Sequence, residues 1–198
     1  MKLPKAKKIN TEKYVPGLSF FKKRAAKVKL SANESALGPS PRAIKEYKKI
    51  SKHFKRYPDS DGVSLKMVLA KKYKLNEKQI IIGSGSDQVL ELVCKAFIKK
   101  NDEVIVSRYS FIVYRIYSKL NEAKVEKAKE KNFKVSINDI LSIVTKKTKI
   151  VFLANPNNPT GTYINYKDLI TLRKKLRSNI LLVVDDAYFE YVDNKDYK

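Results

Sequence analysis

From Gln79 onward the sequence alternates short apolar runs with segments of helical spacing, and this alternation limits the folds open to the chain. The apolar runs QIII, EVIVS, KIVFLAN and NILLVVDD begin near residues 79, 103, 149 and 179. Helical patterns over about 86–99, 112–121 and 166–176 alternate with them. Apolar strands that alternate with helices predict an α/β fold, a mostly parallel sheet with helices on both faces.

The first part of the chain has a different character. Residues 1–38 are polar, lack sustained periodicity and carry two turn signals, VPG at 15–17 and GPSP at 38–41. We therefore expect an N-terminal arm over 1–38 and a domain over 39–198. The patterns at 44–54 and 63–75 predict two helices before the alternation begins.

Composition narrows the function classes. The formal charge of +23 invites a nucleic-acid-binding reading, but the basic residues are spread along the chain, often beside acids. No apolar run is long enough for a membrane span, and the basic N-terminus lacks the apolar stretch of a secretory signal. The single cysteine, Cys94, excludes an internal disulfide and is expected to be an inert buried thiol. A reducing cytoplasm fits these features.

In parallel α/β sheets, ligands bind at the C-terminal ends of the strands, so the residues that follow each apolar run are the candidate site. After QIII comes Gly83-Ser84-Gly85-Ser86-Asp87, which leads into a helix. Glycines permit close backbone approach, and free N–H groups at a helix start favour a phosphate. Alone, this segment fits a glycine turn with a serine cap equally well.

Three more strand ends carry polar or aromatic groups. Tyr109 follows EVIVS, where it could stack on a flat ligand or simply pack. The loop NPNNPTG, residues 155–161, contains two prolines that stiffen it and can hold the amide of Asn158 at a fixed position. Asp185 ends the last apolar run, where a buried carboxylate needs a partner such as a protonated pyridine nitrogen. A helix cap or a surface acid is the alternative for Asp185.

Taken together, these segments resemble one family. GSGSDQ before a helix, NPNNPTG, and a strand that ends in DDAY are similar to the class I/II aminotransferases, which are fold-type I enzymes dependent on pyridoxal 5'-phosphate. Upstream, YVPG, KLSANES, GPSP and RYPD resemble the histidinol-phosphate aminotransferase branch. The resemblance covers essentially the whole chain in the right order, and it implies that 39–198 is part of the cofactor-binding large domain.

The resemblance also implies roles for individual residues. Asp185 matches the aspartate that pairs with the pyridine nitrogen, and Tyr188 and Asn158 match the pair that hydrogen-bonds the phenolic oxygen. Tyr109 matches the stacking aromatic, and Tyr57 matches a tyrosine that reaches the neighbour's phosphate in a homodimer. The phosphate loop corresponds to Ser84, Gly85, Ser86 and Asp87, and the arm positions near the substrate correspond to Tyr14 and Asn33.

The implied reaction is the transfer of an amino group from an amino acid to a phosphorylated keto compound. We expect the amino acid to be glutamate. The lysine that such enzymes join to the cofactor is expected beyond residue 198, so no catalytic lysine is assigned and the chain is expected to be an inactive fragment. Alternatives are an aromatic amino-acid aminotransferase, an amino-acid-phosphate decarboxylase, and a non-catalytic cofactor-binding fragment. No metal site, specific nucleic acid or membrane partner is expected.

Overall fold

The computed structural model describes residues 9–18, 20–21, 24–25 and 28–197. They fall into two compact units, one of Met1–Lys13 with Gly83–Lys198 and one of Tyr14–Ile82. This division follows contacts within the chain and does not test the arm expected over 1–38 or the domain expected over 39–198. Both therefore stay predictions. In the described part of the chain, no helix is both long and apolar enough to cross a bilayer.

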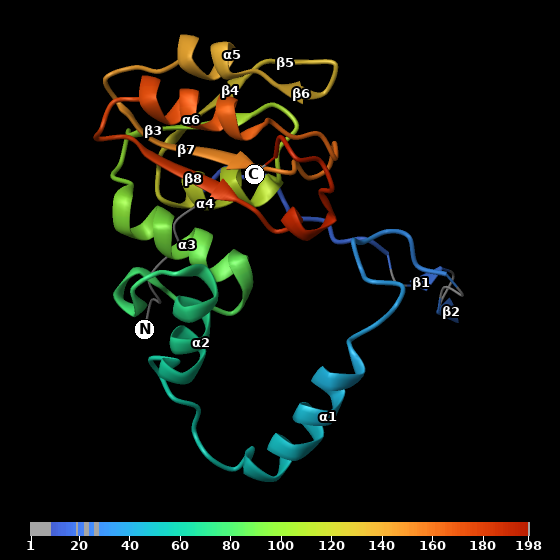
Figure 1. The fold of residues 1–198 in the computed structure, drawn as a ribbon. Helices are drawn as coiled ribbons and strands as arrows, with labels where there is room; N and C mark the ends of the chain where they lie inside the picture. The colour runs from blue at the N-terminus through green and yellow to red at the C-terminus, as the bar shows by residue number, and fades with distance from the viewer. Residues whose placement is uncertain (1–8, 19, 22–23, 26–27, 198) are drawn as a thin grey trace, which may run out of the picture. The chain divides into compact units, whose positions relative to one another are not determined.

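The larger unit is built on a four-stranded parallel sheet (Figure 1). Its order is β4 (Lys124–Ala128), β3 (Glu103–Ser107), β7 (Thr148–Ala154) and β8 (Leu181–Asp185). All three strand pairings are parallel. The central strands β3 and β7 are almost entirely buried, which explains why they are continuous apolar runs rather than alternating ones.

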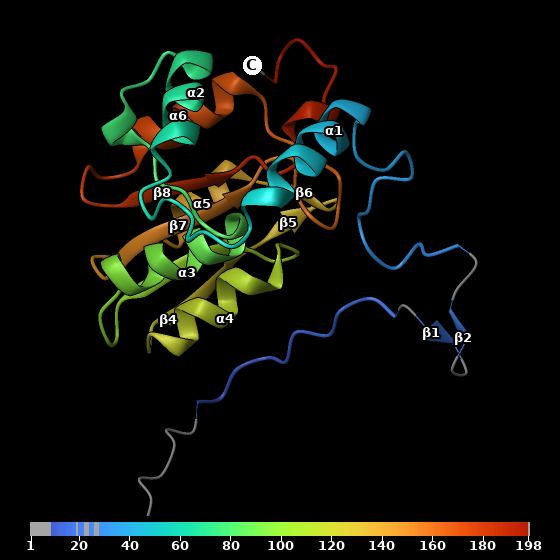
Figure 2. The same ribbon diagram turned by 90° about the horizontal axis from the view of Figure 1, so that it is seen from below.

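Helices cover both faces of this sheet (Figures 1 and 2). On one face lie α3 (Gly85–Phe97) and α4 (Ile112–Leu120), and on the other lie α5 (Ile137–Ser142) and α6 (Tyr166–Lys175). Successive strand residues point to opposite faces. Val104 and Phe152 therefore pack with α3 and α4, whereas Ile105, Val151 and Leu153 pack with α5 and α6. The predicted α/β fold is confirmed.

The described residues of the smaller unit form two α-helices and a short hairpin. Helix α1 (Pro41–Ile50) runs into the 3-10 turn η1 (Ser51–His53), and α2 (Val63–Tyr73) is followed by η2 (Glu77–Gln79). Strand β1 (Phe20–Phe21) pairs antiparallel with β2 (Arg24–Ala25). Ser40 caps α1 by accepting a hydrogen bond from the Ala43 amide at 3.1 Å, and Pro41 opens the helix, three residues before the start predicted from the pattern at 44–54.

The structure departs from the sequence prediction in several places. The QIII run forms no strand, and Ile81 is 74% exposed. An extended segment becomes a strand only when a neighbour accepts its backbone hydrogen bonds, and none of the described strands does so. The elements that were not predicted are the hairpin of β1 with β2, strand β4, the hairpin of β5 (Glu130–Lys131) with β6 (Lys134–Val135), and α5. A short 3-10 turn, η3 (Phe189–Tyr191), follows β8.

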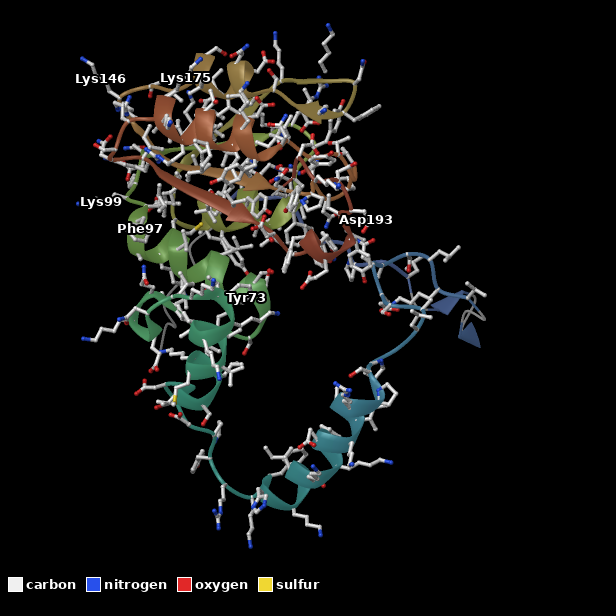
Figure 3. The ribbon with its side chains drawn as sticks, in the orientation of Figure 1. Tyr73, Phe97, Lys99, Lys146, Lys175 and Asp193 are labelled. Atoms are coloured by element: carbon white, nitrogen blue, oxygen red, sulfur yellow. The ribbon has the colours of Figure 1, made fainter. Side chains whose placement is uncertain are left out.

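The charged side chains lie mostly outside this core. Lys99, Lys146 and Lys175 are exposed and project away from the sheet (Figure 3). Cys94, by contrast, is fully buried on the inner face of α3, and burial raises the pKa of its thiol to about 11. It is therefore a protonated core residue at neutral pH, as expected from the apolar run around it.

Replacing Leu172 with alanine should lower the free energy of unfolding by about 2–5 kcal/mol, because this fully buried side chain fills the space between α6 and the sheet. Leu92→Ala is the matched control on α3, where Leu92 is 43% exposed, and should cost less than about 1 kcal/mol. Urea unfolding followed by circular dichroism measures both. Equal losses would contradict the packing of α6 described here.

Candidate active site

Three loops of the larger unit meet at the C-terminal edge of the sheet. Strands β3, β7 and β8 are parallel neighbours, so the residues that follow them emerge at the same edge. Ala154 lies opposite Asp185 in the register, and the Asn155 amide donates to the Asp185 carbonyl at 3.0 Å. The Asn157 side-chain amide donates to the Tyr109 carbonyl at 3.2 Å. The loops 107–111, 155–161 and 185–188 are thus brought together.

Asp185 is held at the end of β8 by two donors. The Tyr114 hydroxyl donates to its Oδ2 at 2.7 Å, and the Ala187 amide donates to its Oδ1 at 3.2 Å. The residue is half-buried. A carboxylate has about four lone-pair positions, so these two bonds orient the group and leave acceptor capacity for a cationic ligand atom.

Asp186 makes different contacts. The Tyr197 hydroxyl lies 3.1 Å from its Oδ1 and is also hydrogen-bonded to the Asn155 carbonyl. Asp185 pairs instead with Tyr114 on α4. Helix α4 covers one face of the sheet, and α6 covers the other. Because neighbouring residues at a strand end point to opposite faces, the two adjacent carboxylates serve different surroundings.

The amides of the 155–161 loop have separate uses. The Asn155 side chain accepts from the Ile164 amide at 2.8 Å and donates to the Ile164 carbonyl at 3.2 Å. The Asn157 amide nitrogen also donates to Thr160 Oγ1 at 2.8 Å. These bonds hold the loop in place, and Asn158 is half-buried within it.

The start of α3 provides backbone donors. Ser84 is its N-cap residue but makes no side-chain capping bond, and Gly85 has φ +74° with open space where a Cβ would stand. Ser84 donates its backbone N–H to the Gln88 side chain at 2.6 Å. The simple serine-cap alternative is therefore not what the structure contains. Ser86 and Asp87 complete an exposed first turn, whose N–H groups lack intrahelical acceptors.

Asp87 is tied to α4. The Tyr117 hydroxyl donates to Asp87 Oδ2 at 2.7 Å, and this hydrogen bond raises the pKa of Tyr117 to about 12. Tyr114, which binds Asp185, lies one turn earlier on the same helix. Helix α4 therefore connects the start of α3 to the end of β8, although neither tyrosine was singled out from the sequence.

Two aromatic residues follow β3, whereas the sequence prediction considered only Tyr109. The ring of Tyr109 is 38% exposed and lies 5.3 Å from that of Phe133. Phe111, two residues later, makes an edge contact with Tyr114 at 5.8 Å between ring centroids. Phe111 was overlooked in the sequence, where the only signal was a second aromatic in the segment SRYSF.

The remaining expected residues are distributed as follows. Tyr188 is half-buried at the start of η3 in the larger unit. Tyr57, Tyr14 and Asn33 belong to the unit Tyr14–Ile82, and Tyr57 is fully exposed. Their roles stay predictions.

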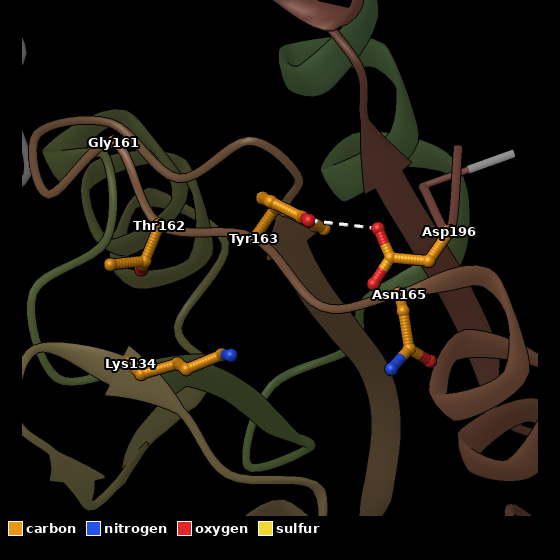
Figure 4. A pocket seen from close by; sticks show the side chains of 6 residues that line it. All are labelled: Lys134, Gly161, Thr162, Tyr163, Asn165 and Asp196. Carbon is orange, nitrogen blue, oxygen red and sulfur yellow. Dashed lines mark hydrogen bonds between the residues drawn. The ribbon is translucent and has the colours of Figure 1, made fainter. Parts of the chain in front are cut away.

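A cavity of about 250 Å³ borders the far end of the 155–161 loop (Figure 4). Its lining comprises Lys134, Gly161, Thr162, Tyr163, Asn165 and Asp196. Tyr163 donates to Asp196 at 2.8 Å, and Asn165 caps α6 by accepting from the Asp168 amide at 2.8 Å. These polar groups are used within the fold. Among the described residues, no cluster of His, Cys, Asp and Glu is suited to a metal ion.

Curated relatives resemble this chain along its whole length. It is 54% identical over 198 residues to a histidinol-phosphate aminotransferase of Pelagibacter ubique, covering 100% of this chain and 55% of that protein. A histidinol-phosphate aminotransferase of Rhodopseudomonas palustris is 44% identical over 186 residues, which are 93% of this chain and 51% of the relative. The chain thus spans about half the length of the curated relatives it matches.

Solved structures share the fold. A putative histidinol-phosphate aminotransferase from Erwinia carotovora superimposes with a TM-score of 0.79 at 25% identity, over 84% of this chain and 49% of that one. The Sinorhizobium meliloti histidinol-phosphate aminotransferase, solved in complex with pyridoxal-5'-phosphate, gives 0.80 at 24% identity, over 84% and 45%. The model of the family "Aminotransferase class I and II" matches residues 25–198. The chain belongs to the class I and II aminotransferase family.

Proposed function

We propose that this chain is the cofactor-binding part of a pyridoxal-phosphate-dependent histidinol-phosphate aminotransferase. Such an enzyme would move an amino group from glutamate to a phosphorylated keto compound such as imidazole acetol phosphate. The names of the relatives at 54% and 44% identity support this substrate class. The observation that carries the proposal is structural: Asp185 is oriented by Tyr114 at 2.7 Å on the sheet edge where the site loops meet.

The residues present fit this cofactor, on which the family depends. Asp185 offers a carboxylate of restricted orientation for a pyridinium nitrogen. The exposed first turn of α3 offers N–H groups for a phosphate. Two buried polar atoms at the same strand ends, Ser107 Oγ and Asn157 Oδ1, have no hydrogen-bond partner within the described structure. Such atoms are costly unless a ligand or water satisfies them.

When bound, pyridoxal phosphate supplies an electron sink for the carbanion that forms at the substrate carbon. Asp185 would keep a proton on the ring nitrogen by pairing with it. Tyr188 and Asn158 would donate hydrogen bonds to the phenolic oxygen. The segment of Ser84, Gly85 and Ser86 would bind the phosphate through N–H groups of the first turn of α3 and a serine hydroxyl, while the Ser84 N–H stays bonded to Gln88. Asp87, which is fixed by Tyr117, would shape that loop rather than touch the anion.

The intact protein would be a cytoplasmic homodimer with isologous contacts, the commonest symmetry of oligomers. Tyr57 is fully exposed, as a residue that reaches a neighbouring subunit's phosphate should be in an isolated chain. Tyr14 and Asn33, both exposed, would lie near the substrate.

The function can be tested in a joined protein, in which this chain is followed by the part of the Pelagibacter ubique relative that it does not match. With pyridoxal phosphate and glutamate, the joined protein should aminate imidazole acetol phosphate in steady turnover, measured by the 2-oxoglutarate released. Aromatic keto acids serve as competing acceptors. A preference for them, or turnover no faster than free cofactor, would overturn the assignment.

Asp185→Ala should weaken pyridoxal phosphate binding to the joined protein by about 10–100-fold, because a charge-assisted hydrogen bond to the ring nitrogen is lost. Asp186→Ala removes the adjacent carboxylate, which contacts Tyr197 instead, and should change affinity by less than about threefold. Isothermal titration calorimetry compares the two. Equal losses would show that Asp185 is not the ring partner.

Either Tyr109, the sequence candidate, or Phe111 could stack on the ring. Phe111 is favoured by its contact with Tyr114, the residue that holds Asp185. We expect Phe111→Ala to weaken cofactor binding by about tenfold, through lost aromatic contact, and Tyr109→Ala to weaken it less. The same calorimetry decides between them, and the reverse order would return the role to Tyr109.

A further inference from the structure

Helix α4 carries two tyrosines whose hydroxyls reach opposite ends of the candidate site. Tyr114 donates to Asp185 at 2.7 Å, and Tyr117 donates to Asp87 at 2.7 Å. The two residues are one turn apart, a spacing that places side chains on the same side of a helix. One rigid element therefore contacts both the end of β8 and the start of α3.

Packing alone does not explain the hydroxyl of Tyr114. The side chain is fully buried and its ring stacks on Phe152, with 5.0 Å between centroids and 4° between planes. A phenylalanine would fill the same space without burying a hydroxyl, which needs a hydrogen-bond partner when withdrawn from water. The hydroxyl is placed where Asp185 is that partner.

Helix α4 is itself held on two sides. Its inner face is buried, with Ser118 donating back to the Tyr114 carbonyl at 2.6 Å. Near its outer face, Glu12 lies 3.0 Å from Lys119 and 3.4 Å from Arg115. A helix fixed in this way holds the two tyrosine hydroxyls, and the two carboxylates that they contact, in defined positions.

Both tyrosines remain donors at neutral pH. Burial, and then the charge of Asp185, raise the pKa of Tyr114 far above its ordinary value. The hydrogen bond to Asp87 raises the pKa of Tyr117 to about 12. Each hydroxyl therefore keeps its proton and can direct only a donor hydrogen bond toward the acid it contacts.

We propose that Tyr114 and Tyr117 are positioning residues for the two ends of the cofactor site. Tyr114 fixes the carboxylate of Asp185 in the orientation that pairs with the ring nitrogen. Tyr117 holds the carboxylate of Asp87 against α4, so that the N–H groups of the α3 first turn stay available to the phosphate. This inference rests on the proposed function, because it assumes that pyridoxal phosphate is the ligand.

Three ligands separate the two ends in the joined protein: pyridoxal phosphate, its 1-deaza analogue, which lacks the ring nitrogen, and pyridoxal, which lacks the phosphate. Tyr114→Phe should weaken binding of pyridoxal phosphate by about fivefold and leave binding of the deaza analogue unchanged. Tyr117→Phe should weaken both phosphorylated ligands by a similar factor and leave pyridoxal unchanged. Calorimetric titration measures all six affinities.

Tyr163→Phe is the matched control, because it removes a tyrosine hydroxyl that donates to Asp196 at 2.8 Å outside the site (Figure 4). It should change none of the three affinities. Thermal unfolding of the three variants shows whether each is folded. If Tyr114→Phe is unfolded at the temperature of the titration, the parent protein and all variants are titrated at a lower temperature at which each is folded.

A second measurement uses the double variant of Tyr114→Phe with Asp185→Ala. If Tyr114 acts through Asp185, its substitution should have no further effect on affinity once Asp185 is alanine. Additive losses, or equal losses for pyridoxal phosphate and the deaza analogue, would overturn the positioning role. A parent protein that binds no pyridoxal phosphate would instead refute the proposed function, so the two failures are distinguishable.

Discussion

Parallel pairing of β3, β7 and β8 is the constraint on which the candidate site depends. The backbone register that places Ala154 beside Asp185 also fixes where the 155–161 loop leaves the sheet. Burial of both faces by four helices stabilises that register, because a one-residue slip would exchange the residues that face α3 and α4 with those that face α5 and α6. The loops inherit their positions from this packed layer.

Most of the polar groups at this edge of the sheet have defined hydrogen-bond partners within the fold. The Asn155 side chain bonds the backbone of Ile164, and the Asn157 amide nitrogen donates to Tyr109 and Thr160. Asp186 contacts Tyr197. Asp185 is the carboxylate turned toward α4, where the stacked pair of Tyr114 and Phe152 excludes water from one side of it. In such surroundings a charge interacts more strongly with a cationic partner than it would in water.

Several features of the fold were readable in the sequence because they depend on neighbouring residues. The apolar runs at β3, β7 and β8 and the helical spacing of α3, α4 and α6 predicted the parallel sheet. Strand β4 was not predicted because KVEKA is half-exposed at the sheet edge and carries charges, so it lacks the continuous apolar run of the central strands. The composition of the QIII run predicts a strand, but a strand also requires a hydrogen-bonding neighbour, which composition cannot supply.

The sequence by itself determined the α/β class, the family resemblance and the segments that follow the strands, since strand ends and turn residues are local signals. The tertiary structure decided which side chains meet there. Tyr114 and Asp185 are 71 residues apart, and Tyr117 and Asp87 are 30 apart. Their contacts follow from strand order and from the way α4 packs on the sheet. Neighbouring carboxylates such as Asp185 and Asp186 look alike in a sequence, and only the opposite faces of a folded strand give them different partners.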